Sequence, residues 1–330
     1  MRSPLRVLGL LRTSVKDTWV IPNRLLLLPN VFSPTIETRR TELAIFQLKD
    51  GRAFDYISND VASDTAILFH HGTPGECTGW QKWFSDLTNV RAIAASRPGY
   101  GLSDRRKGRT VASDIDDQSE LLEFFGIKKF MSIGWSGGGP HAINMTRHPN
   151  CVGAITLAGV GEWGNKDLDF LEGMGPENHE EFGAALNGEA DIENWMKKNF
   201  PAFANVQGSE LIESFGGLIG DADKKALTPD VAEEDAKSFR RALSKGYYGW
   251  LDDDLAFVQS FGFNLGEIDK PVLVWQGDDD FMVPRAHSEW LAKHIPTAKL
   301  NFVSGHGHIS LGESYRSEII DQAIRLLNTL

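Results

Sequence analysis

From about residue 41 onward, short apolar runs alternate with segments of helical spacing, and this alternation constrains the fold most. Thr65–His70 and Arg91–Ala95 are typical of buried strands, and helical spacing follows over residues 111–125. Strands that alternate with crossover helices form a parallel sheet with both faces covered. We therefore predict an α/β domain with strands at 41–48, 51–58, 65–70, 91–95, 128–134, 152–160, 271–276 and 299–303, and helices at 80–87, 111–125, 137–148, 284–294 and 313–330.

Between residues 163 and 254 the alternation stops, and helical segments rich in aromatic side chains take its place. We predict that residues 163–254 form a helical cap inserted into a core of residues 41–162 and 255–330. Residues 1–40 are expected to form an N-terminal extension that packs on the core. Most cap aromatics are expected to form the core of the cap itself; they are Phe170, Phe182, Trp195, Phe200, Phe203, Phe215, Phe239, Tyr247, Tyr248 and Trp250.

The net charge of −11 and the isoelectric point near 5.3 bear on the partners of the chain. Such an acidic chain lacks the basic face that binding to a nucleic-acid backbone requires. Its two cysteines, Cys77 and Cys151, cannot form a disulfide framework and do not have metal-ligand spacing. No apolar run approaches the roughly 20 residues that span a bilayer. We therefore expect no nucleic-acid partner, no bound metal ion and no integral membrane segment.

The N-terminal residues bear on the location of the protein. The apolar run at residues 7–11 is too short for the core of a signal peptide, and Arg12 ends it. A cytoplasmic location is therefore expected. Arg2, Arg6 and Arg12 precede the first acidic residue, Asp17, as in a mitochondrial-type presequence, which is the alternative.

The sequence Gly134-Trp135-Ser136-Gly137-Gly138 stands where a predicted strand ends and a predicted helix begins. A serine in such a strained turn needs glycine neighbours, because the Cβ atoms of larger residues would clash. The turn lifts the serine hydroxyl above the sheet. The N-terminus of the following helix favours negative charge that develops there. Ser136 is therefore the candidate nucleophile.

A nucleophilic serine needs a base that accepts its proton and a carboxylate that orients the base. Candidates for both roles follow the last two predicted strands, at the sheet edge where open α/β sheets place their sites. Asp278, Asp279 and Asp280 compete for the role of the acid, and His306 and His308 for that of the base.

A turn after the third predicted strand, His71-Gly72-Thr73-Pro74-Gly75, supplies a fourth element. Its geometry can aim the backbone N–H of Thr73 at the reaction centre. Together with the N–H of Gly137, this group would form an oxyanion hole. We expect the His71 imidazole itself to be a packed side chain of the turn.

These motifs together resemble the α/β-hydrolase superfamily, in particular the capped serine hydrolases that include proline iminopeptidases, esterases and lactonases. The resemblance implies an eight-stranded, mostly parallel sheet, with the cap inserted between strands six and seven, and no cofactor. It extends from about residue 40 to residue 330. The motifs that carry it are the turn at 71–75, Arg97-Pro98-Gly99-Tyr100-Gly101-Leu102-Ser103, the serine turn at 134–138, the run from Gly277 through Asp280 to Val283-Pro284, and Gly307-His308.

The resemblance also implies roles for individual residues. Ser136 corresponds to the nucleophile, Asp280 to the acid and His308 to the base. The family spacing after the preceding glycine selects Asp280 among the three aspartates, and the small and apolar residues that follow His308 favour it over His306. Glu162, which follows the sixth strand, is an alternative acid because some relatives use that position.

The function implied is hydrolysis of a carboxylic ester, lactone or amide of a small, apolar substrate through an acyl-enzyme. Trp135 and Met282 are predicted to contact this substrate; the oligomeric state is left open. A carbon–carbon bond hydrolase would use the same triad. One alternative is an aminopeptidase of the proline-iminopeptidase type, in which cap carboxylates hold a substrate ammonium, although Thr73 departs from the H-G-G-P-G turn of that type. Another is a ligand-binding relative without hydrolytic activity.

Overall fold

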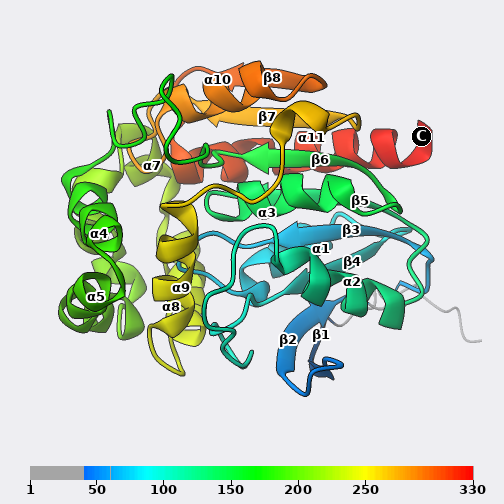
Figure 1. The fold of residues 1–330 in the computed structure, drawn as a ribbon, viewed down its shortest axis with the longest axis horizontal. Helices are drawn as coiled ribbons and strands as arrows, with labels where there is room; N and C mark the ends of the chain where they lie inside the picture. The colour runs from blue at the N-terminus through cyan, green and yellow to red at the C-terminus, as the bar shows by residue number, and fades with distance from the viewer. Residues whose placement is uncertain (1–40, 60, 330) are drawn as a thin grey trace, which may run out of the picture. The chain divides into compact units, whose positions relative to one another are not determined.

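A computed structural model describes residues 41–59 and 61–329 of the chain (Figure 1). The predicted extension at residues 1–40 lies outside the described residues. Eight strands form one sheet: β1 (Glu42–Gln47), β2 (Ala53–Ser58), β3 (Thr65–His70), β4 (Arg91–Ala95), β5 (Lys129–Trp135), β6 (Cys151–Leu157), β7 (Val272–Gly277) and β8 (Ala298–Val303). All eight predicted strands are present, with ends that differ by a few residues.

The strand order in the sheet is β1-β2-β4-β3-β5-β6-β7-β8. The pairings β1–β2 and β2–β4 are antiparallel, whereas the pairings from β4 through β8 are parallel. The predicted eight-stranded, mostly parallel sheet is therefore confirmed.

Helices cover both faces of the sheet. Because successive side chains of a strand point to opposite faces, each central strand packs against helices on both sides. In β3, Ile67 and Phe69 belong to a core cluster with residues of α1 (Gln81–Phe84) and α11 (His308–Thr329). Ala66 and Leu68 belong to a second cluster with residues of α2 (Asp114–Phe124). On the face of α2 lie also α3 (Gly138–Asn144) and α10 (Arg285–His294). Both faces of the central strands are buried, which explains their uninterrupted apolar character.

Two helix predictions differ from the structure. The helix predicted at 80–87 is a 3₁₀ turn at Cys77–Trp80 followed by the single-turn α1. Its early end coincides with Ser85, whose hydroxyl donates to the carbonyl of Lys82 and so competes with the helical pattern. The last helix, predicted from residue 313, begins already at His308.

A helical insertion follows β6, as predicted, and lies at the carboxyl edge of the parallel strands (Figure 1). It contains α4 (Pro176–Asn187), α5 (Glu189–Ala204), α6 (Leu211–Phe215), α7 (Asp221–Ala226), α8 (Pro229–Ala242) and α9 (Tyr248–Phe257). We propose residues 163–254 as the cap and residues 41–162 and 255–330 as the core. The second boundary falls within α9, whose Phe257 packs in a core cluster with Val272 of β7.

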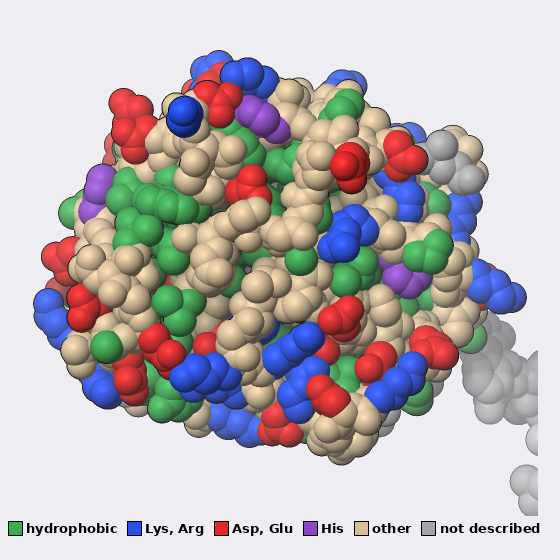
Figure 2. All heavy atoms as spheres, in the orientation of Figure 1, with side chains coloured by type: hydrophobic (Ala, Val, Ile, Leu, Met, Phe, Trp, Pro, Cys, Tyr) green, Lys and Arg blue, Asp and Glu red, His purple; other side chains and the backbone are tan. Residues whose placement is uncertain are grey.

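The surface mixes charges of both signs. On the face shown in Figure 2, acidic and basic side chains are interspersed. This face lacks the continuous basic stripe that marks nucleic-acid binding. Of the helices in the described ranges, none is both long enough and apolar enough to cross a membrane.

Candidate active site

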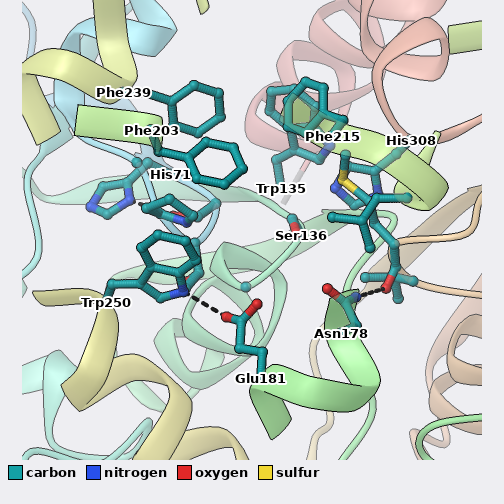
Figure 3. Close-up of a pocket in the computed structure, with 18 of the residues that line it drawn as sticks. His71, Trp135, Ser136, Asn178, Glu181, Phe203, Phe215, Phe239, Trp250 and His308 are labelled. Atoms are coloured by element: carbon teal, nitrogen blue, oxygen red, sulfur yellow. Dashed lines mark hydrogen bonds between the residues drawn. The ribbon is translucent and has the colours of Figure 1, made fainter. Parts of the chain in front are cut away.

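The turn between β5 and α3 places Ser136 at the base of a cavity (Figure 3). Ser136 has a φ of 57°, a strained value for a residue with a side chain, and its N–H donates to the carbonyl of Leu157 at 2.8 Å. A Cβ atom on Gly134 would lie 2.1 Å from the carbonyl oxygen of Gly138, and one on Gly138 would lie 2.2 Å from that of His70. The glycines are therefore required for the close approach that holds Ser136 in this conformation.

His308 and Asp280 form a buried pair beside this turn. The distance from His308 Nδ1 to Asp280 Oδ2 is 2.9 Å. The other carboxylate oxygen, Asp280 Oδ1, accepts the N–H groups of Met282 (3.0 Å) and Val283 (2.8 Å). Because the carboxylate accepts at Nδ1, the hydrogen-bond network assigns the proton to that nitrogen and leaves Nε2 available as a base.

Two opposing effects set the pKa of His308. Burial disfavours the imidazolium, but the charge of Asp280, the hydrogen bond from Nδ1 and the charge of Asp223 together outweigh burial. The pKa of His308 is therefore raised above its ordinary value. An imidazolium at this position is stabilised, as a base that takes up a proton during a reaction requires.

Ser136 and His308 line the same cavity, and the ring of Trp135 stacks on that of His308 with centroids 5.6 Å apart. Within the described ranges, Ser136 Oγ makes no hydrogen bond. Such contacts are often long in enzymes without substrate and shorten in the complex.

The other two candidate aspartates have different partners. Asp278 accepts the hydroxyl of Ser304 and the N–H of Gly305, both at 2.6 Å, and so shapes an exposed loop. Asp279 Oδ2 accepts the N–H of Ala222 at 2.9 Å. The structure therefore brings only Asp280, of these three, against His308.

The alternative base and the alternative acid also lie elsewhere. His306 is oriented by the carbonyl of Ser304 at 3.1 Å, and its ring packs against Tyr315. Glu162 Oε1 accepts the N–H of Phe261 at 2.7 Å and the hydroxyl of Ser260 at 2.8 Å. Both side chains have structural partners of their own.

The predicted oxyanion donors lie together beside Ser136. A Cβ atom on Gly137 would approach Thr73 Oγ1 to 2.4 Å, and one on Gly72 would lie 3.3 Å from the Ser136 Cβ. Gly137 is the N-cap of α3, so its N–H precedes the first intrahelical hydrogen bond. The loop that carries Thr73 therefore abuts the helix start that carries Gly137.

A buried network, which the sequence does not predict, holds this loop. His71 Nε2 accepts the N–H of Arg97 at 2.9 Å, and His71 Nδ1 lies 2.7 Å from the carbonyl of Gly72. The Arg97 guanidinium donates to that carbonyl and pairs with Asp253 at 2.7 Å, and Thr73 Oγ1 donates to Asp253 at the same distance. Burial, followed by the Arg97 charge, lowers the pKa of His71, so its imidazole is a neutral, packed group.

The cavity has a volume of about 270 Å³ and is mostly apolar. Trp135 and Met282, the predicted substrate contacts, both line it. Most cap aromatics pack in core clusters, as expected, and six of them also line the cavity: Phe182, Trp195, Phe203, Phe215, Phe239 and Trp250. By contrast, Tyr247 lies against Phe200, and its hydroxyl donates to Glu193 at 3.0 Å.

Two buried carboxyl groups, those of Glu181 and Asp254, line the cavity, and Figure 3 shows Glu181 beside Trp250. Glu181 Oε1 accepts the indole N–H of Trp250 at 2.6 Å, and Asp254 lies beside Glu181. Apart from the adjacent Glu181 carboxyl group, no described residue offers a hydrogen-bond partner to either oxygen of Asp254. Burial raises the pKa of Glu181 to about 7, and burial together with Glu181 raises that of Asp254 well above its ordinary value. Neither residue was a candidate from the sequence, where they are two acids among many in the insertion.

Among the described residues, one group of side chains has the donor types of a metal site: Asp55, Glu76 and Cys77. The Arg241 guanidinium of α8 pairs with Asp55 at 2.7 Å and also with Glu76. Because a fixed cation already neutralises these carboxylates, the group ties α8 to the sheet and is a poor fit for a metal ion.

An eight-stranded, mostly parallel sheet, with a serine turn beneath a helical insertion, is typical of a class of hydrolases. Residues 65–315 match the family model described as alpha/beta hydrolase fold. The chain belongs to this family and is a hydrolase of the α/β fold.

Characterised relatives span several activities. A bifunctional esterase/perhydrolase from Acinetobacter calcoaceticus is 26% identical over 243 residues, which cover 72% of this chain and 82% of the relative. A 2-hydroxy-6-oxononadienedioate/2-hydroxy-6-oxononatrienedioate hydrolase from Burkholderia vietnamiensis is 25% identical over 274 residues, which cover 79% of this chain and 87% of that protein. An esterase structure from Exiguobacterium antarcticum has a TM-score of 0.64 at 16% identity and covers 86% of this chain and 99% of its own. At that identity the structural likeness shows the fold alone.

Proposed function

We propose that this hydrolase cleaves a carboxylic ester, lactone or amide of a small, largely apolar substrate through an acyl-enzyme. Ser136 is the proposed nucleophile, His308 the base and Asp280 the acid that orients it. The observation that carries the proposal is the Asp280–His308 pair, 2.9 Å between Oδ2 and Nδ1, whose histidine lines the same cavity as Ser136. The apolar cavity wall supports an apolar acyl or alcohol group.

In this mechanism Ser136 Oγ bonds to the carbonyl carbon while His308 Nε2 accepts the hydroxyl proton. The carbonyl oxygen becomes an oxyanion, to which the N–H groups of Thr73 and Gly137 donate. The tetrahedral intermediate expels the leaving group, which takes the proton from His308. A water molecule then gives its proton to His308, attacks the acyl carbon and releases the carboxylic acid, and Ser136 Oγ regains its proton.

The test is labelling with a fluorophosphonate together with turnover of p-nitrophenyl esters of increasing acyl length. We expect wild type to be labelled, and Ser136→Ala to lose labelling and about 10⁶-fold in kcat while keeping its thermal unfolding midpoint. Esterase activity that persists in purified Ser136→Ala would contradict the assignment. A folded wild type that neither labels nor turns over any ester, amide or carbon–carbon bond substrate would instead indicate a ligand-binding relative.

One observation favours a second candidate, an aminopeptidase. The adjacent carboxyl groups of Glu181 and Asp254 line the cavity, and apart from Glu181 no described residue offers Asp254 a hydrogen-bond partner. A substrate ammonium would supply both the missing donors and the missing positive charge.

Hydrolysis of proline aminomethylcoumarin, compared with that of a short p-nitrophenyl ester, separates the two candidates. An aminopeptidase prefers the first substrate, and Glu181→Gln lowers kcat/KM for that substrate alone. An esterase prefers the second substrate and responds to Glu181→Gln equally with charged and uncharged substrates.

A further inference from the structure

Asp223, in helix α7 of the insertion, is buried against the first turn of α11. Its Oδ2 accepts the N–H of His308 at 2.8 Å. Its Oδ1 accepts the N–H of Ile309 at 3.0 Å, and both the N–H and the hydroxyl of Ser310 at 2.8 Å. All four donors belong to the residues that begin α11. A side chain from the insertion therefore caps the helix whose first residue is the proposed base.

The residues just before Asp223 contact the loop of the proposed acid. Ile219 forms an antiparallel bridge with Asp280, and Ala222 donates its N–H to Asp279 at 2.9 Å. A Cβ atom on Gly220 would lie 2.3 Å from Asp279 Oδ2, so the two segments are in close contact. One short stretch of the insertion, Ile219–Asp223, thus contacts the acid loop and the base helix at once.

The packing of Asp223 around the proposed base, His308, is equally close. A Cβ atom on Gly307 would lie 2.6 Å from the carboxylate of Asp223, so the loop before His308 rests directly on this side chain. Four donors and no acceptor among the described residues point at the carboxylate, which is the pattern that a charged carboxylate requires. Burial raises the pKa of Asp223, and the hydrogen bonds from Ser310 together with the charge of His308 oppose this effect. When ionised, Asp223 places its negative charge at the backbone of His308.

We propose that Asp223 is a positioning residue for catalysis: through it, the segment Ile219–Asp223 of the cap holds His308 in register with Asp280 and supplies a second negative charge to the imidazolium. This inference rests on the proposed roles of His308 and Asp280. It assigns the insertion a part in the chemistry as well as in substrate selection.

The charge has a measurable consequence for the pH dependence. The titratable groups that face His308 are Asp280, from the loop after β7, and Asp223, from α7. Both raise the pKa of His308 against the effect of burial. Removing the charge of Asp223 also leaves the N-terminal amides of α11 unopposed, which further disfavours the imidazolium. Without Asp223, His308 should lose its proton at lower pH.

The experiment compares Asp223→Asn with wild type in kcat/KM for a p-nitrophenyl ester across pH. The acid limb is expected to move down by about one pH unit, and the plateau value to fall about 10- to 100-fold because the base is displaced. The matched control is Asp221→Asn, which removes the same charge from an exposed position of α7. It should leave the acid limb and the plateau of kcat/KM unchanged. In Asp223→Glu, which keeps the charge, the acid limb of kcat/KM should lie at its wild-type pH.

An Asp223→Asn variant whose limb and plateau match wild type overturns the proposal, as does a loss of activity that is equal at every pH. If this variant does not fold, Ser310→Ala decides, because it removes one donor and keeps the charge. We then expect a several-fold fall in kcat with an unmoved limb, and unchanged kcat overturns the proposal. Absence of ester turnover in wild type would contradict the proposed function instead.

Discussion

His308 and His306 are two residues apart, yet their surroundings have nothing in common. His308 is buried, bonded to Asp280 and stacked on Trp135. His306 bonds a backbone carbonyl and packs on Tyr315. These surroundings support His308, and not His306, as the proposed base.

This difference predicts unequal effects of the same substitution. We expect His308→Ala to lower kcat for a p-nitrophenyl ester by about 10⁶-fold, since removing a base costs as much as removing the nucleophile. His306→Ala should keep activity within a few-fold of wild type. Steady-state kinetics on the two purified variants measures both effects. The reverse ranking would show that the base is assigned two residues too late.

At the scale of elements, the insertion and the sheet contribute different parts of the cavity. The sheet edge supplies Ser136, His308 and the loop of Thr73, whereas aromatic side chains of the insertion form much of the wall. Chemistry and substrate choice should therefore respond to different substitutions.

Trp195→Leu and Trp250→Leu remove aromatic wall, and we expect each to change the ratio of kcat/KM for short and long p-nitrophenyl esters by about tenfold. Trp135→Leu tests the wall contributed by β5. Labelling of Ser136 by a small fluorophosphonate should change little. Kinetics on two esters, with thermal unfolding measured in parallel, provides the readout.

Tyr247→Leu is the control for these variants. Tyr247 packs on Phe200 outside the cavity, so its loss should lower the unfolding temperature and leave the ester ratio unchanged. Ester ratios that stay at the wild-type value in all three tryptophan variants would mean that the tryptophans only pack.

At the scale of the whole molecule, most buried charges are paired, as Arg97 with Asp253 and Arg241 with Asp55. Glu181 and Asp254 are not paired in this way, because each faces another carboxyl group. Burial without a cation disfavours their ionised forms. The folded state should therefore be destabilised when they ionise.

The sign of this effect follows from linkage. Because the folded state raises the pKa of Glu181 from 4.5 to about 7, it binds that proton more tightly than the unfolded chain does. The resulting stability is fully present below the unfolded pKa and is lost as the pH rises through about 7. Glu181→Gln cannot ionise and keeps an acceptor for Trp250.

We therefore expect Glu181→Gln to gain in unfolding temperature over wild type as the pH rises from 5 to 8, by roughly 2–4 °C per kcal/mol. Differential scanning fluorimetry across pH measures the gain, and Glu180→Gln, at an exposed neighbouring position, is the control. A difference that stays constant with pH would mean that Glu181 does not titrate in this range.

The sequence alone predicted those structural features that depend on residues close together in the chain. Apolar runs predicted all eight strands, because burial on both faces of a parallel sheet leaves few polar positions. The glycines around Ser136 predicted the serine turn, because backbone crowding acts within a few residues. The start of α11 could not be predicted in this way. It begins at His308, where its capping group, Asp223, is 85 positions away in the chain.

Only the tertiary structure decided which charged residues meet. Asp278, Asp279 and Asp280 are chemically identical, and the path of the loop after β7 turns only Asp280 onto His308. Asp253, at 156 positions from Arg97, could not be told from its neighbours in sequence. The physical reason is range: periodicity and steric strain act between near neighbours, whereas hydrogen bonds and ion pairs join whatever side chains the packing of the sheet and the insertion brings together.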